Sequence, residues 1–266
     1  MKIFDCFLYC DENLILDIRL HTLYKFVEKF IIVESKYDHQ GNKKKTNFIF
    51  KDNYEKNKIK YLIMDEKFPL KTDLWKNQAI QREYLLNNLN FVDNDDYIFF
   101  SDPDEIPRPE LLINFTLKKK YGIFLQKCFN FKLNLFNPHE TPWEGTRVAK
   151  KKNLKSIDFM RQKIKSKNLN YSFFRIDKEK SIELFNEGGW HFNNVMSSKE
   201  ISIKLKTFAH SEFSDSKFSD VKIIQDKINN KVDLFNRGHK YFKIEIDKSF
   251  PQFIVNNKSL FQKWIL

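Results

Sequence analysis

Three carboxylates lie within four positions directly after a strand-like apolar segment, and this arrangement constrains the chain more than any other feature. Residues 97–100 are Tyr, Ile, Phe and Phe, and Asp102, Asp104 and Glu105 follow them. In an α/β sheet such a run is a buried central strand, and ligands bind just beyond its carboxyl end. Clustered carboxylates repel one another, so they predict a divalent metal shared with substrate phosphates. A solvated surface turn is the alternative.

The composition is that of a packed globular protein with a large positive charge. Of 266 residues, 16% are aromatic, and 47 Lys and Arg outnumber 35 Asp and Glu to give a net charge of +12. This aromatic content supports an apolar core and argues against a disordered chain. The charge suits phosphate-bearing ligands, nucleic acid or an anionic membrane surface.

Cysteine usage and hydropathy predict a cytoplasmic protein that is soluble, or peripheral at a membrane. Cys6, Cys10 and Cys128 fit neither a disulfide framework nor a zinc knuckle, so reduced thiols are expected. A signal-peptide pattern is not expected, because Asp5 interrupts the first apolar run. Uncharged stretches stay shorter than the ~20 residues that span a bilayer.

The beginning of the chain predicts a βαβ unit. Residues 2–9 have a strand pattern, residues 11–28 a helical one, and residues 30–33 a second strand pattern. Such a unit has parallel strands joined by a right-handed crossover. Glu34 follows the second strand, so we expect it at the same sheet edge as Asp102.

A third strand is expected at residues 59–63 and a helix at residues 73–90. Gln78 and Arg82 lie on or beside the apolar stripe of that helix. Burying a charge alone is costly, so Arg82 needs a partner. The partner is either a structural carboxylate or the phosphate or uracil of a ligand, which a planar guanidinium suits. The apolar stripe itself consists of Trp75, Ala79, Leu86 and Leu89.

The rest of the chain predicts a single domain with a C-terminal helical extension. We expect a helix from residue 108 to about 119, one or two strands within 122–136, a loop at 137–147, and helices at 198–209 and 217–231.

Between the expected loop and these last helices, residues 188–191 read Gly-Gly-Trp-His. Paired glycines allow close approach of the backbone to another group. They present either ligand-binding side chains, or a core Trp190 beside a hydrogen-bonded His191.

Together these segments resemble glycosyltransferase family 17, the β-1,4-N-acetylglucosaminyltransferase family. The most specific blocks are Ser-Asp-Pro-Asp-Glu-Ile-Pro-Arg at residues 101–108 and Gly-Trp-His-Phe at residues 189–192. The similarity spans about residues 3–212, and residues 140–180 depart from it. Further matching residues are Asp5-Cys6-Phe7, Glu12, Leu16, Ile18, Arg19, Leu20, Val33-Glu34-Ser35, Gly41 and Gln81-Arg82.

The resemblance implies an α/β fold of the GT-A type, with helices on both faces of a nucleotide-binding sheet. Residues 1–266 would form one domain, in which about residues 1–120 bind the nucleotide sugar and about residues 121–266 bind the acceptor. The implied reaction is inverting. It moves a sugar, GlcNAc by the family default, from a UDP-sugar to a hydroxyl of a glycan or glycoconjugate.

The resemblance also implies roles for individual residues. Mn²⁺ or Mg²⁺ would be held by Asp102, Asp104 and His191. Besides the two aspartates, the residues expected at the nucleotide sugar are Glu34, Gln78, Arg82 and Trp190.

An acceptor hydroxyl must also lose its proton to a base. Glu105, Glu187 and Glu144 are the candidates, and Glu105 is preferred because it lies inside the strongest motif.

Two other classes of protein remain open from the residues alone. A metal-dependent phosphohydrolase would use the cluster of Asp102, Asp104 and Glu105 and release phosphate without an acceptor. A basic nucleic-acid-binding protein would use the +12 charge and the aromatics. Clustered carboxylates argue against the second class because they repel a phosphate backbone, so no specific nucleic-acid partner is expected.

Overall fold

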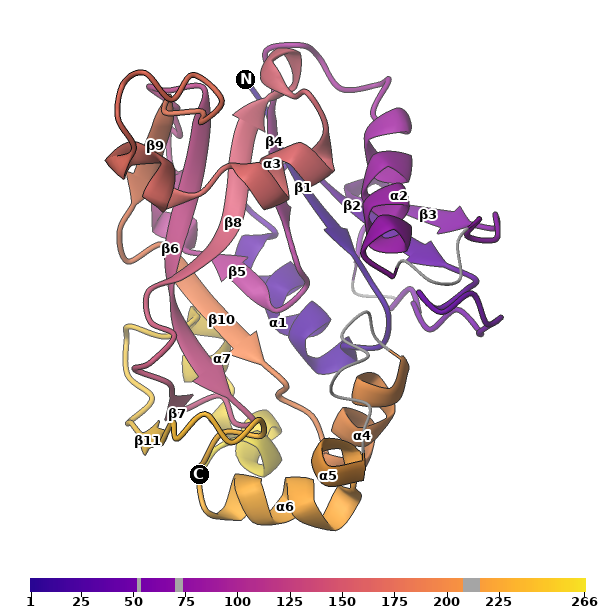
Figure 1. Cartoon of the computed structure of the whole chain (residues 1–266), viewed down its shortest axis with the longest axis vertical. Helices are drawn as coiled ribbons and strands as arrows, with labels where there is room; N and C mark the ends of the chain where they lie inside the picture. The colour runs from indigo at the N-terminus through magenta and orange to yellow at the C-terminus, as the bar shows by residue number, and fades with distance from the viewer. Residues whose placement is uncertain (52–53, 70–73, 208–215) are drawn as a thin grey trace.

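A mixed β-sheet with helices on both faces forms the centre of the computed structural model, which describes residues 1–51, 54–69, 74–207 and 216–266 (Figure 1). In these residues the strands are β1 (Ile3–Leu8), β2 (Lys29–Ser35), β3 (Ile59–Met64), β4 (Tyr97–Ser101), β5 (Glu105–Pro107), β6 (Tyr121–Asn130), β7 (Leu135–Phe136), β8 (Trp143–Lys150), β9 (Ile182–Phe185), β10 (Gly189–Asn193) and β11 (Phe242–Lys243). The helices are α1 (Asn13–Leu23), α2 (Leu74–Asn87), α3 (Ile157–Lys163), α4 (Ser198–Thr207), α5 (Ser216–Ser219), α6 (Val221–Asn229) and α7 (Gln252–Asn256). The α/β class expected from the sequence is confirmed.

The strands follow the order β11-β7-β6-β8-β4-β1-β2-β3 across the sheet. β1 is parallel to β2 and β4, and β2 is parallel to β3, as the predicted βαβ unit requires. β8 is antiparallel to both β4 and β6, and β10 joins β6 in parallel and β5 antiparallel. The carboxyl ends of β1, β2 and β4 therefore meet at one edge, where the acidic residues lie.

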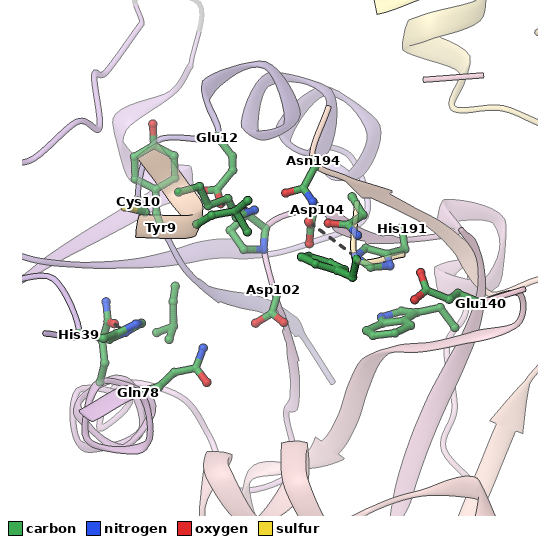
Figure 2. A pocket seen from close by; sticks show the side chains of 18 of the residues that line it. Tyr9, Cys10, Glu12, His39, Gln78, Asp102, Asp104, Glu140, His191 and Asn194 are labelled. Atoms are coloured by element: carbon green, nitrogen blue, oxygen red, sulfur yellow. Dashed lines mark hydrogen bonds and ion pairs between the residues drawn. The ribbon is translucent and has the colours of Figure 1, made fainter. Parts of the chain in front are cut away.

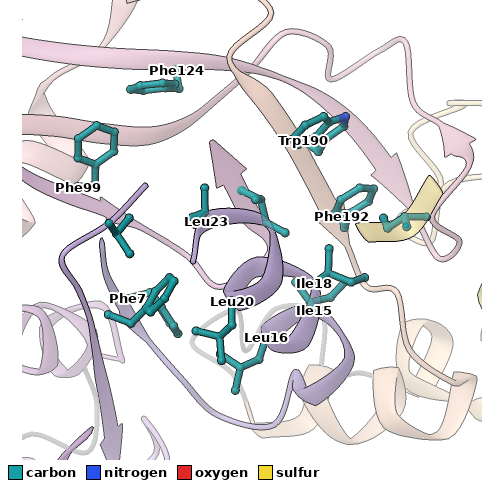
Figure 3. Close-up of a cluster of buried hydrophobic side chains, with 14 of the residues drawn as sticks. Phe7, Ile15, Leu16, Ile18, Leu20, Leu23, Phe99, Phe124, Trp190 and Phe192 are labelled. Carbon is teal, nitrogen blue, oxygen red and sulfur yellow. The ribbon is translucent and has the colours of Figure 1, made fainter. Parts of the chain in front are cut away.

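Alternating side chains of the central strands build a core on each face of the sheet. On one face, Phe7 and Phe99 pack with α1 and with Trp190 and Phe192 of β10 (Figure 3). On the other face, a second cluster includes Phe4, Ile98, Leu85 of α2 and Met160 of α3. A third cluster joins α4 and α6 to Leu135 of β7.

The structure differs from the sequence prediction in two segments of the middle of the chain. The helix expected at residues 108–119 is a short 3₁₀ helix at Pro109–Leu112, because Ile113 is extended and Asn114 has a positive φ of 51°. The loop expected at residues 137–147 ends earlier, because Trp143 already begins β8, which finds partners in β4 and β6.

The C-terminal helices also differ in their limits. The helix expected at residues 217–231 is divided into α5 and α6 at Asp220, whose side chain caps α6 by accepting from the backbone of Lys222 at 2.8 Å. The predicted end of the preceding helix, at residue 209, lies outside the described residues. None of the described helices is long and apolar enough to span a bilayer. The functional division of the chain near residue 120 stays a prediction.

Candidate active site

The turn formed by residues 102–105, here called the acidic turn, is held by the buried side chain of Arg19 in α1. The guanidinium pairs with Asp5 of β1 at 2.6 Å, and these side chains are 0% and 1% exposed. It also donates to the Ser101 hydroxyl at 2.7 Å and to three carbonyl oxygens of the turn at 2.9–3.3 Å. One fully paired arginine thus fixes the path of the backbone from β4 into β5.

A second arginine, Arg161 of α3, pairs with the carboxylates of this turn. Its Nη2 donates to Asp102 Oδ2 and to Glu105 Oε1, both at 2.6 Å, and its Nη1 donates to Glu105 Oε2 at 2.9 Å. Burial would raise the pKa of Asp102, but the positive charges of Arg161 and Arg82 outweigh it and lower that pKa. Asp102 is therefore a carboxylate at neutral pH, and 35% of its side chain is exposed.

His191 of β10 lies against Asp104, the other aspartate of the turn. The distance from His191 Nε2 to Asp104 Oδ2 is 3.6 Å, and His191 Nδ1 lies 3.6 Å from the sulfur of Cys128. Burial disfavours the charged form of each side chain, but the electrostatic attraction between them outweighs this penalty. The pKa of Asp104 is lowered to about 2 and that of His191 is raised well above its ordinary value. The pair is therefore an imidazolium facing a carboxylate.

The paired glycines before His191 allow β10 to approach its neighbouring strands. A Cβ on Gly189, whose φ is +132°, would lie 2.1 Å from the carbonyl oxygen of Ile106 in β5. A Cβ on Gly188 would lie 2.7 Å from the backbone nitrogen of Leu125 in β6. The close approach expected from the sequence is thus made to the protein's own backbone, and it brings His191 beside the acidic turn.

Asp102, Asp104 and His191 line one cavity of about 490 Å³. Figure 2 shows His39 and Gln78 at one end of the cavity, the two aspartates of the acidic turn in the middle, and Glu140 beyond His191 at the other end. A cavity of this size suits a small-molecule ligand, because such pockets span roughly 300–1,000 Å³. The other polar or aromatic residues that line it are Tyr9, Cys10, Glu12, Gln81, Trp143, Asn193, Asn194, Lys204, Phe235 and Arg237.

Helix α2 turns Gln78 and Gln81 toward this cavity, and the apolar stripe expected from the sequence faces inward only in part, since Leu89 is 0% exposed. Trp75 of that stripe is 48% exposed. Two side chains of α2 contact His39: Gln81 Oε1 lies 3.0 Å from His39 Nε2, and the Asn77 amide donates to the His39 carbonyl at 2.8 Å. Burial lowers the pKa of His39, so its imidazole is neutral at pH 7. The buried residues of α2 are Asn77, Gln78, Gln81, Arg82 and Leu85.

Comparison with known families identifies the chain. The sequence profile of glycosyltransferase family 17 matches residues 1–138, just over half of the 266 residues. The chain belongs to glycosyltransferase family 17. The matched segment contains Arg19 and the acidic turn, whereas Arg161 and His191 lie beyond it. Family membership makes the protein a glycosyltransferase, with a sugar donor and an acceptor as its partners.

Solved structures resemble this family 17 chain only distantly. HddC from Yersinia pseudotuberculosis is 13% identical, with a TM-score of 0.37 over 70% of this chain and 90% of that one. A putative glucose-1-phosphate thymidylyltransferase from Bacillus anthracis is 10% identical, with a TM-score of 0.34 over 69% and 86%. The inositol-1-phosphate CTP transferase from T. maritima is 12% identical, with a TM-score of 0.35 over 77% and 96%. No curated protein sequence matches the chain.

Besides the two aspartates, four residues were predicted to bind the nucleotide sugar, and only one of them lines the cavity. Gln78 lines the cavity of the family 17 chain, and Arg82 lies behind it. Glu34 is 0% exposed and accepts from Lys44 Nζ and from the Tyr61 hydroxyl. The described residues that line the cavity do not include Arg82, Glu34 or Trp190. Trp190 is instead part of the core, and its indole donates to the Ser249 carbonyl at 3.0 Å.

The described residues that line this cavity include none of the three candidate bases. Glu105 is 0% exposed, and besides Arg161 it accepts from the indole of Trp143 at 2.7 Å. Glu144 pairs with Arg147 at 3.1 Å. Glu187 pairs with Lys127 at 3.0 Å, and its side chain is 66% exposed. Their catalytic roles stay predictions.

The structure brings two further residues to the site that the sequence did not assign to the nucleotide sugar or the metal. Trp143 stacks on His191, with ring centroids 4.6 Å apart. Lys204 of α4 lines the cavity, and its Nζ lies 3.5 Å from Glu12 Oε1. Burial would lower the pKa of Lys204, but Glu12, Asp104 and Asp11 together raise it. From the sequence, Trp143 lies in the loop expected at residues 137–147, where it could stack on a sugar or fill the core, whereas Lys204 had no local signal.

The pairing of His191 with Asp104 predicts a pH dependence of stability. Because the folded pKa of His191 is raised, its contribution is complete below the unfolded pKa of ~6.5 and is lost as pH rises through the folded pKa. One proton gives a slope of at most ~1.4 kcal/mol per pH unit. Urea unfolding from about pH 6 to 9, with a chelator present, should show this decline in the wild type and a flatter profile in His191→Gln. Equal slopes in the two proteins would contradict the pairing.

Arg82→Lys is expected to destabilise the fold. Arg82 donates to Asp158 Oδ1 at 2.7 Å and to Gln78 Oε1 at 2.8 Å, and a lysine cannot reach in both directions. The free energy of unfolding should fall by about 1–3 kcal/mol, measured by urea denaturation. Arg175→Lys, in an exposed pair with Asp177, is the matched control and should change little. Weaker UDP-sugar binding at unchanged stability would instead support direct contact of Arg82 with the nucleotide.

Proposed function

We propose that this family 17 member is an inverting, metal-dependent transferase that moves a sugar from a UDP-sugar to a glycan hydroxyl, with GlcNAc as the sugar by family analogy. The observation that carries the proposal is the meeting of Asp102, Asp104 and His191 at the middle of one cavity. Two carboxylates beside an extended ligand pocket suit the metal ion of a nucleotide diphosphate, and the imidazolium of His191 suits its phosphates.

The two carboxylates of Asp102 and Asp104 suit a metal ion whose other ligands come from the substrate. In the described part of the chain, no group of three or more His, Cys, Asp or Glu side chains is spaced to hold a metal ion by itself. Asp102 and Asp104 would hold Mn²⁺ or Mg²⁺ together with the phosphates of the nucleotide sugar. His191 would become a third ligand only after its imidazolium has lost a proton, and a neutral imidazole would favour Mn²⁺. When bound, the ion acts as a Lewis acid that neutralises charge on the leaving UDP.

The two ends of the cavity suit the two halves of the reaction. At the α2 end, neutral His39 and the amides of Gln78 and Gln81 offer hydrogen bonds to an uncharged base and ribose. At the other end, the indole of Trp143 offers an apolar face to an acceptor sugar ring. Between them, Lys204 provides a positive charge for the developing diphosphate.

Glu140 is the carboxylate at the acceptor end of the cavity, and it takes the proton of the acceptor hydroxyl. Its Oε1 accepts from Arg237 at 2.7 Å and its Oε2 accepts from Asn137 at 2.8 Å, so its position is fixed. Figure 2 places it on the far side of His191 from His39 and Gln78. A base there faces the acceptor, as general base catalysis requires.

Thermal-shift measurements with nucleotide sugars, each with and without Mn²⁺, test the function. A UDP-sugar that binds the folded state should raise Tm only when Mn²⁺ is present. UDP-GlcNAc is expected to give the largest shift. Release of inorganic phosphate without an acceptor would identify a phosphohydrolase instead. Stabilisation by single-stranded nucleic acid and by no nucleotide sugar would identify a nucleic-acid-binding protein.

Glu140→Gln is expected to lower kcat by about 10²–10⁴-fold, the range for loss of a general base, and to leave the Kd for the UDP-sugar nearly unchanged. Glu187→Gln is the matched control, because Glu187 lies outside the residues that line the cavity and carries the same side chain. Steady-state kinetics of the two variants decide between the candidates. Full activity of Glu140→Gln, or an equal loss in Glu187→Gln, would contradict the assignment.

A further inference from the structure

A loop before β9 carries large apolar side chains that point into solvent. Residues 171–178, here called the apolar loop, follow the 3₁₀ helix at Ser166–Asn170. Phe173, Phe174 and Ile176 are 87%, 88% and 94% exposed, more than any other large apolar side chain of the described residues. A cluster of this kind marks an interaction surface, because its exposure to water is unfavourable.

Hydrogen bonds within the segment hold the apolar loop in one conformation. The Lys180 ammonium donates to the carbonyl of Ser172 at 2.7 Å and to those of Phe173 and Arg175 at 3.3 Å. The backbone of Arg175 donates to Ser172 at 2.9 Å, and its side chain pairs with Asp177 at 2.7 Å. The backbone is thus paired locally, and the apolar side chains are presented outward by an ordered turn.

Basic residues surround the apolar loop. Residues 163–180 contain six Lys and Arg and two Asp and Glu, which leaves a charge of +4. Three further lysines, residues 118–120, lie at the start of β6 beside β9, since Tyr121 pairs with Ile182 and Lys120 lies 3.4 Å from Glu179. The apolar side chains therefore project from a positively charged surface.

We propose that the apolar loop docks the protein on an anionic membrane surface. Phe and Ile side chains bury in the boundary between headgroups and acyl chains, and surrounding lysines are attracted to anionic lipids. The basic residues around the loop favour a membrane over another protein as its binding partner. An apolar groove on another protein would have to desolvate them, whereas an anionic bilayer pairs with them.

The docking surface lies apart from the cavity. In Figure 1 the loop lies beside β9, at the end of the molecule opposite α4–α6, and α4 carries Lys204 of the cavity wall. Docking through the loop would leave the cavity open to solvent. Loss of membrane binding should therefore leave turnover of a soluble acceptor unchanged, so the test is independent of the proposed function.

Co-sedimentation of the full chain with vesicles tests the proposal. The wild type should bind phosphatidylcholine vesicles that contain about 30% phosphatidylserine, and bind pure phosphatidylcholine poorly. Phe173→Ser/Phe174→Ser should weaken binding to the anionic vesicles by roughly tenfold or more. Ile49→Ser/Leu260→Ser is the matched control, because those side chains are 71% and 68% exposed elsewhere, and it should bind as the wild type does.

A second variant tests how much the positive charge contributes to vesicle binding. Lys119 and Lys167 are exposed near the loop, and Lys119→Glu/Lys167→Glu should also weaken binding to the anionic vesicles. Raising the salt from about 50 to 500 mM should weaken wild-type binding further.

The proposal is overturned if the wild type does not bind the vesicles, or if the serine variant binds them equally well. It is also overturned if light scattering shows a wild-type dimer that the serine variant abolishes, because the loop would then join two copies of the chain.

Discussion

Asp104→Asn is expected to abolish metal-dependent binding of the nucleotide sugar and to lower turnover by about a hundredfold or more. Asp104 lines the cavity, and its carboxylate faces the imidazole of His191 at 3.6 Å. Asparagine has the same shape but loses the charge that a divalent ion requires. The fold should persist, because the backbone carbonyl of Asp104 still accepts from Phe192 at 2.9 Å.

Calorimetric titration with UDP, with and without Mn²⁺, measures this effect directly. Asp95→Asn is the matched control, since Asp95 is 60% exposed and pairs with Lys150 and Lys152 at the surface. Its affinity for UDP and Mn²⁺ should equal that of the wild type. Unchanged affinity in Asp104→Asn would remove the metal assignment, whereas a cooperative unfolding transition like that of the wild type shows that the variant is folded.

The sequence predicted the sheet and the acidic turn because the signals for both are local. An apolar run that ends in carboxylates identifies β4 and the turn after it, and strand, helix and strand patterns identify β1, α1 and β2. His191 was also expected at the acidic turn, because paired glycines before it indicated a close approach. These features need only a few neighbouring residues to be recognised.

The partners of the acidic turn could not be predicted, because they come from distant segments without a pattern of their own. Arg161 bonds to Asp102 and Glu105 across 59 and 56 positions in the sequence. It lies within residues 140–180, which depart from the family resemblance. The role that the family resemblance gave to one tryptophan also differs from its place in the structure. Trp190 was expected at the ligand but is packed in the core, while Trp143 of β8 reaches the cavity.

The helical stripe expected within residues 73–90 faces inward only in part, because Leu89 is 0% exposed whereas Trp75 is 48% exposed. Helical periodicity predicts that the apolar stripe faces inward, and this holds when the interior is a core. Here the interior beside α2 is a cavity with buried His39, so Gln78 and Gln81 are turned inward instead. Such exceptions are expected at functional sites, where binding a ligand outweighs packing.

Arg161→Met is expected to cause the largest loss of stability, about 3–5 kcal/mol of unfolding free energy, because it leaves the buried charge of Glu105 without a cationic partner. The side chain of Arg161 is 9% exposed, and that of Glu105, which it pairs with at 2.6 Å, is 0% exposed. Methionine fills similar space but cannot pair with the carboxylate. Arg175→Met, in an exposed pair with Asp177, is the control and should change stability by less than about 1 kcal/mol.

Urea unfolding of Arg161→Met, Glu105→Gln and the double variant separates the lost pair from lost packing. If unpaired charge causes the destabilisation, the double variant should be more stable than Arg161→Met, because glutamine removes the buried charge that methionine left behind. If the two effects simply add, the pairing does not stabilise the acidic turn. Arg19, which bonds to three carbonyls of the turn, would then fix its position alone.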